Sequence, residues 1–192
     1  MPIAFAERVV SLLNGRRLTR REYVGLLGQL YYFSAAAQVH LRQVIDRIDD
    51  PALSRWFVHH AAEERGHHRW AEQDLRDLGE AIPLPLPATV RLMAHMDEVA
   101  SGPRPYLVLG ISSVAENLSP LLDPAALLPE GVNGASRYLT RHAILDQGHS
   151  EDVNRQVSML SDLRRAEVEE EARRFEELML EFFLAAAGIS HD

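Results

Sequence analysis

Apolar residues recur every three to four positions along nearly the whole chain, a spacing that predicts amphipathic helices. No convincing alternation of apolar and polar residues interrupts it, so no β-strand is expected. The pattern predicts seven helices, over residues 3–14, 19–48, 51–78, 88–101, 106–121, 134–159 and 162–187. The fold class that follows is an all-α helical bundle.

Local signals support several of these helix ends. Thr19 and Glu22 have the spacing of a capping box at the start of the second helix. Asp50 and Pro51 are typical of the beginning of a helix, and Gly79 of the end of one. The segment IPLPLP, which follows, is expected to be a loop.

Two of the predicted helices carry the same arrangement of metal-binding side chains. The first is His60-x3-Glu64-x2-His67, and the second is His142-x3-Asp146-x2-His149. At about 100° per residue, a step of four turns the side-chain direction by roughly 40°, and a step of seven returns it to within roughly 20°. We therefore expect each triplet to face one way. Imidazole and carboxylate are ligands for iron, manganese and zinc, and two facing helices with such triplets could enclose metal.

Other residues bear on the ligand set. Acid-x-x-His pairs on two helices, together with carboxylates from other helices, build the di-metal sites of helical bundles. Glu116 stands alone in an apolar helix and is a candidate bridging carboxylate, although a salt bridge would also explain it. His60 could be an additional ligand, could orient Glu64, or could carry protons. The remaining alternatives are Glu63 or His68 as ligands, a residue of the second helix facing the site (Gln29, Tyr31, Tyr32, Gln38 or His40), and Trp56 and Trp70 as pocket walls or as core.

Composition limits the function further. The 192 residues suffice for one domain, 1–192, and 46% hydrophobic residues with a net charge of -8 describe an ordinary soluble protein. The acidic balance disfavours a nucleic-acid partner, and no apolar run is long enough to span a membrane. The chain has no cysteine, so oxygen and nitrogen are the available ligands, and the composition is compatible with the cytoplasm. A homodimer formed through a helix face remains open.

The order of these motifs resembles the heme-oxygenase-like diiron oxidases and oxygenases, over roughly residues 19–187. The resemblance implies a seven-helix heme-oxygenase-like bundle in which three carboxylates and three histidines hold two irons. It places the ligand role on Glu64, His67, Glu116, His142, Asp146 and His149. One departure is that His60 stands where some members have a glutamate. Manganese in place of iron is left open by the ligand types.

The expected function is therefore an iron-dependent oxidase or oxygenase that takes dioxygen, a small organic substrate and electrons from an external donor. The resemblance suggests an amino-acid, amine or fatty-acid substrate. Three alternatives remain: a ferritin-like iron oxidase, a metal-free or heme-binding member of the same fold, and a non-catalytic interaction protein. The first predicts a carboxylate from the first long helix, and residues 23–45 contain none.

Overall fold

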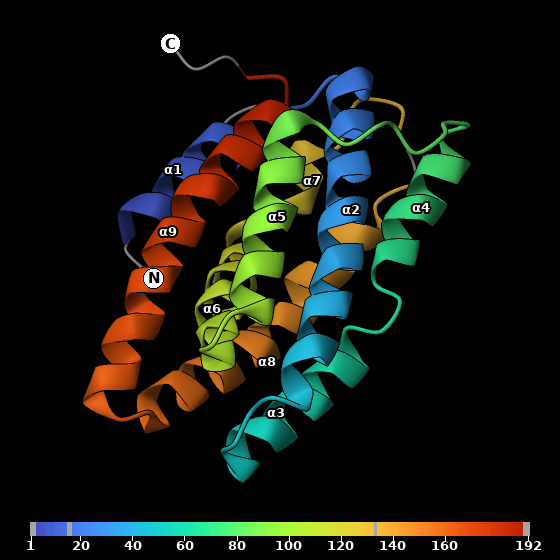
Figure 1. The fold of residues 1–192 in the computed structure, drawn as a ribbon. Coiled ribbons are helices and arrows are strands. Elements are labelled where there is room, and N and C mark those ends of the chain that lie inside the picture. Colours follow the sequence, from blue (N-terminus) through green and yellow to red (C-terminus); the bar gives the residue numbers. More distant parts are fainter. Residues whose placement is uncertain (1–2, 15–16, 133, 190–192) are drawn as a thin grey trace.

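The computed structural model describes residues 3–14, 17–132 and 134–189, and these residues form helices joined by turns and loops, without any strand. Nine α-helices and two short 3-10 helices follow one another as α1 (Ile3–Asn14), α2 (Arg20–Ile45), α3 (Pro51–Glu63), α4 (His68–Asp77), α5 (Pro87–Ser101), η1 (Pro105–Leu107), α6 (Val108–Leu118), η2 (Ser119–Leu121), α7 (Pro124–Leu127), α8 (Arg137–Met159) and α9 (Asp162–Ala186). The predicted all-α bundle is confirmed (Figure 1). None of the helices is both long and apolar enough to cross a lipid bilayer, within the part of the chain that is described.

The predicted helix over residues 51–78 is wrong, because the structure divides it into α3 and α4. Residues 64–67 form turns between the two helices, and Gly66 has a positive φ of 89°. This left-handed conformation is accessible to glycine but costly for other residues, so Gly66 ends the helical path. The side chain of Gln38 on α2 donates a hydrogen bond of 2.9 Å to the carbonyl of Glu64, which holds the connection in place.

Other boundaries differ less. Thr19 and Glu22 form the predicted capping box at the start of α2. The helix predicted over 106–121 is shorter, since α6 is flanked by η1 and η2, and α7 lies in a region that was expected to be a loop.

Helix α2 lies between α4 and α5 and also contacts α3 (Figure 1). Its apolar face joins the other helices in one hydrophobic core that includes the fully buried rings of Tyr23, Phe57 and Phe175. Burial of a side chain such as Phe57 contributes about 1.5–3 kcal/mol relative to exposure. Phe57 belongs to α3, so this burial also fixes the helix that carries His60.

The start of α8 is tied to α4 through one fully buried carboxylate. Asp74 Oδ2 accepts a hydrogen bond of 2.9 Å from the backbone N–H of Tyr138, and Arg137 donates one of 2.9 Å to Asp74 Oδ1. Asp74 thereby occupies one of the free N–H groups at the start of α8, where Ser136 makes no side-chain cap. This contact fixes the position of α8 beside the segment that bears His67.

Close packing of α6 against α9 brings Glu116 into the bundle. A Cβ atom at Gly110 would lie 2.6 Å from the carbonyl oxygen of Val168, so glycine is needed for this approach. Helix α6 is apolar over most of its surface, and the burial of its flanks carries Glu116 to a position 7% exposed.

Candidate metal centre

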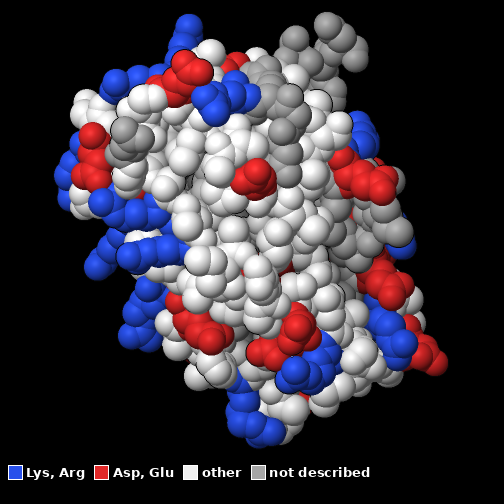
Figure 2. Space-filling model, turned by 180° about the vertical axis from the view of Figure 1, so that it is seen from behind, with Lys and Arg blue, Asp and Glu red and all other residues white. Residues whose placement is uncertain are grey.

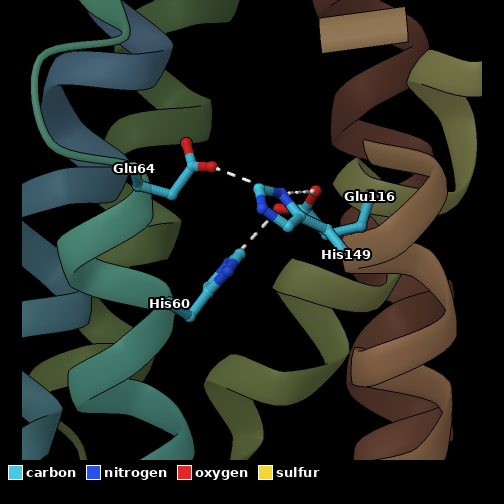
Figure 3. A group of neighbouring side chains, drawn as sticks. All are labelled: His60, Glu64, Glu116 and His149. Carbon is cyan, nitrogen blue, oxygen red and sulfur yellow. Dashed lines mark hydrogen bonds and ion pairs between the residues drawn. The ribbon is translucent and has the colours of Figure 1, made fainter. Parts of the chain in front are cut away.

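Three parts of the chain meet around a buried group of histidines and carboxylates. His60 comes from α3, Glu116 from α6, and His149 from α8, while Glu64 lies at the end of α3 (Figure 3). The second triplet behaves as its spacing predicts, because His142, Asp146 and His149 are all buried on one face of α8. The first triplet also reaches the site, although the break at Gly66 rather than one continuous helix directs His67 there.

Two sets of potential ligand atoms result, and they share one residue. The first set is His60, Glu64, Glu116 and His149, and the second is Glu64, His67 and His142; within each set the ligand atoms lie within 4.8 Å of one another. Glu64 belongs to both sets. The structure thus gives the shared position to Glu64, whereas Glu116, the candidate bridge from the sequence, lies in the first set.

His149 is surrounded by carboxylates. Its Nδ1 atom lies 3.2 Å from Glu116 Oε2, 3.4 Å from Asp146 Oδ1 and 3.5 Å from Glu64 Oε1. Asp146 is therefore next to the first set without belonging to it. On the other side of the ring, Nε2 of His149 lies 3.7 Å from Glu63, which is partly exposed.

These contacts set the charges of the group. Burial opposes a proton on His149, but its close contacts with the carboxylates of Asp146 and Glu116 outweigh this effect and raise the pKa of His149 to about 11. Burial likewise acts against the charge on Glu116, yet its bonds with His149 and His60 lower the pKa of Glu116 to about 2. For Asp146, burial dominates and raises the pKa to about 7. A proton on His149 thus offsets part of the carboxylate charge at neutral pH.

The pKa values of His60 and His142 are shifted in opposite directions. His60 Nε2 lies 3.3 Å from Glu116 Oε1; burial opposes its proton, but this contact raises the pKa of His60 overall. Burial lowers the pKa of His142, so this ring is neutral. Its Nδ1–H donates a hydrogen bond of 2.8 Å to the carbonyl of Tyr138, which leaves the lone pair on Nε2 available to a metal.

Three buried polar atoms of the site make no well-directed hydrogen bond with another described residue, although charged groups lie near them: Glu64 Oε1, His67 Nδ1 and Asp146 Oδ1. Buried polar atoms are nearly always paired in folded proteins. A cation bound between the two sets would satisfy oxygen and nitrogen lone pairs together. The residues therefore fit a metal by their chemistry, by their burial and by these polar atoms that lack a well-directed hydrogen bond.

The residues that surround the ligands were only partly foreseeable. Tyr138 was missed; it lies four residues before His142, on the same helix face, and its hydroxyl is 2.6 Å from Ser34 Oγ. Neither Glu63 nor His68 belongs to a ligand set. Trp56 and Trp70 do not line the cavity described below; they stack on His60 and His67, with ring centroids 4.8 and 4.0 Å apart.

An apolar cavity adjoins the ligands. Five α2 residues form one stripe along it (Leu26, Leu30, Phe33, Ala37 and Leu41), which at 1.5 Å per residue extends about 22 Å. Helices α6 and α9 contribute further apolar walls, including Ile111, Met179 and Phe183. His60, Glu64, Glu116, His142 and Asp146 line the same cavity. A molecule bound there would touch the candidate metal centre.

The fold and the site define a helical protein with a heme-oxygenase-like architecture and a buried histidine–carboxylate centre. The chain belongs to the iron-containing redox enzyme family, whose model matches residues 24–181. The structure is similar to that of a domain of unknown function with a heme oxygenase-like fold from Shewanella denitrificans OS217. The two share 23% sequence identity and a TM-score of 0.74, over 95% of this chain and 82% of the other. No curated protein sequence matches the chain. The predicted family and fold are confirmed.

Proposed function

We propose that the protein is a non-heme diiron oxidase or oxygenase that uses dioxygen to oxidise a small organic substrate. The observation that carries the proposal is the pair of ligand sets that share Glu64, since one carboxylate common to two sets is the arrangement expected for two neighbouring ions. Bound iron would supply the electrons and open coordination positions with which dioxygen is activated.

The proposed ligands are Glu64, His67, Glu116, His142, Asp146 and His149. In this arrangement His60 acts with the ligands of the first set, because its Nε2 atom is directed at Glu116 from 3.3 Å. Among the described residues, Glu64 Oε1, His67 Nδ1 and Asp146 Oδ1 make ion-pair contacts but no well-directed hydrogen bond, which supports metal binding over a hydrogen-bonded core network.

The cavity favours an apolar substrate. Its walls are mostly aliphatic and aromatic, and no lysine or arginine of the described chain lines it. A small amino acid or amine would cover little of this apolar surface and would therefore gain little from burial there. An aliphatic chain of fatty-acid type would bury its length against the α2 stripe while one end lay beside the ligands. This wall also supports an enzyme over a ferritin-like iron oxidase, which has no need of it.

The test is the iron content of protein loaded under anaerobic conditions, followed by its optical spectrum on exposure to air. The proposal expects about two irons per chain, one for each ligand set, and a transient visible absorption that decays faster when a fatty acid of matching length is present. Iron content near one, or two irons without any reaction with air, would contradict the dinuclear proposal. Zinc-loaded protein serves as the control that binds metal but does not react with air.

A further inference from the structure

Trp70 connects the second ligand set to the protein surface. Its indole stacks on His67, with ring centroids 4.0 Å apart and an interplanar angle of 25°, and meets His142 edge-on at 5.4 Å. His67 and His142 are two of the three residues in that set. The two imidazoles are buried whereas Trp70 is only half-buried. One aromatic ring thus spans the distance from the candidate metal centre to solvent.

Arginine surrounds the outer end of this connection. The guanidinium of Arg141 lies over the Trp70 ring, 4.9 Å from its centroid. Arg65, in the turn before α4, and Arg69, next to Trp70 in the sequence, are exposed, and neither they nor Arg141 makes a salt bridge with another described residue. In Figure 2, arginine side chains gather along the left edge of the face, which is the side of α4 when the view of Figure 1 is turned by 180°. The acidic side chain of Glu72 on α4 is already paired with Arg76.

This concentration of positive charge contrasts with the chain as a whole, which has a net charge of -8. Unpaired, exposed arginines around an aromatic side chain are typical of a surface that attracts an acidic partner. The chemistry proposed for the site requires electrons from outside. This surface could attract a negatively charged electron carrier, and the ring of Trp70 gives a short aromatic path from it to the candidate metal centre.

We propose that Arg65, Arg69 and Arg141 form a docking surface for an acidic one-electron carrier protein, and that Trp70 is the entry point for its electron. The destination of the electron rests on the function proposed above. In each transfer the carrier loses one electron and is oxidised, and one ferric ion is reduced to ferrous. The electron crosses Trp70 and His67, and no covalent bond forms or breaks.

Trp56 offers a comparison on the same molecule. It stacks on His60 of the first ligand set, at 4.8 Å and 17°, and is also half-buried. Among the described residues, however, the cation–π contacts join Arg141 to Trp70 and Arg164 to Tyr106, and none involves Trp56. The contact with Arg141 therefore distinguishes Trp70 from Trp56 and favours Trp70 as the point of entry.

The docking surface is testable without iron. Binding of a plant-type [2Fe–2S] ferredoxin, an acidic one-electron carrier, is measured by calorimetry on the metal-free chain at low and moderate salt. We expect salt-sensitive binding that weakens by about tenfold or more in R65Q/R69Q/R141Q. The control is R8Q, which removes an exposed arginine of α1 on the far side of the bundle from α4 (Figure 1). Absent binding, equal loss in R8Q, or tighter binding of a short DNA duplex would overturn the docking surface.

Entry through Trp70 is tested by mixing reduced ferredoxin with oxidised, iron-loaded protein and following ferredoxin oxidation by its visible absorbance. W70F should slow the transfer several-fold while calorimetric affinity for ferredoxin stays unchanged, and W56F should transfer at the wild-type rate. Equal rates in W70F and wild type would overturn the role of Trp70. If the chain bound no iron, the function proposed above would fail, whereas the calorimetric result on docking would stand.

Discussion

His149 carries most of the charge balance at the site. One of its nitrogens faces Glu116, Asp146 and Glu64 within 3.5 Å, and its pKa is raised to about 11. A protonated imidazole among three carboxylates occupies the position that a metal cation would fill. The same contacts that hold the proton therefore define a site where metal and proton compete.

Replacement of His149 by alanine removes a proposed ligand from the first set. We expect iron affinity to fall by more than about 100-fold, beyond the usual effect of losing a residue that only supports a ligand. Iron content after dialysis, measured by plasma emission, checks this. The control is His59→Ala on α3, whose side chain is 71% exposed and belongs to neither ligand set. Equal iron content in the two variants would remove His149 from the ligand set.

Metal binding should release protons in an amount that depends on pH. With pKa values of about 11 for His149 and about 7 for Asp146, both groups hold a proton at pH 6, and mainly His149 does at pH 8. Ligands must be deprotonated, so these two groups should release roughly two protons per chain at pH 6 and roughly one at pH 8.

This release is measured with an indicator dye during anaerobic iron(II) titration in weak buffer. His149→Ala should lower it by about one proton at both pH values. A release independent of pH would show that Asp146 does not lose a proton on metal binding.

At the scale of the elements, the break between α3 and α4 determines the second ligand set. It places His67 Nδ1 3.0 Å from Glu64 Oε2, and Asp74 on α4 then fixes α8 beside it. The connection depends on one backbone conformation, the positive φ of Gly66. A continuous helix would carry His67 in a different direction.

Gly66→Ala should therefore destabilise the fold and disturb the second ligand set. The added Cβ would meet only Arg69 Cδ, at 3.9 Å, so the cost is the left-handed conformation itself, about 1–2 kcal/mol. Denaturant unfolding measures the loss, and iron content should fall toward that of the first set alone. The matched control is Gly148→Ala within α8, where a Cβ meets nothing within 4 Å and stability should rise by about 0.5–1 kcal/mol. Equal stability changes in the two variants would contradict this role of Gly66.

Periodicity and ligand spacing were sufficient to predict the bundle and the shared face of the second triplet. The second prediction is correct because α8 is one unbroken helix, on which His142, Asp146 and His149 are all buried. The same reasoning predicted the first triplet on a continuous helix, which is wrong. A single glycine between charged residues leaves the apolar period intact, and its φ depends on contacts such as Gln38 with Glu64. The shared position of Glu64 and the charge state of His149 depend on distances between helices, which periodicity does not contain.

For the whole molecule, the buried carboxylates make stability depend on pH, and the proposed metal would add to this dependence. Asp146, with a pKa of about 7 in the folded chain against 3.8 for the free side chain, holds its proton more tightly when folded. Its stabilising contribution is therefore fully present below about pH 4 and is lost as the pH rises through 7. His149, raised to about 11 from 6.5, acts in the same direction: its contribution is full below about pH 6.5 and declines above it.

Removal of metal should therefore lower the melting temperature more at pH 8 than at pH 6. At pH 6 protons on Asp146 and His149 compensate part of the charge of Glu64 and Glu116, whereas at pH 8 the proton on Asp146 is gone. Metal present at 100 times its Kd stabilises the fold by about 2.7 kcal/mol, which corresponds to roughly 5–10 °C for a chain of this size.

Calorimetry of iron(II)-loaded and chelator-treated protein, both kept anaerobic, measures the difference in melting temperature at each pH. The melting temperature of the His149→Ala variant should change very little on chelation at either pH, because this variant binds little metal. If chelation left the melting temperature of the wild-type protein unchanged at pH 8, the buried carboxylates would not depend on a cation, and the metal centre itself would be in question.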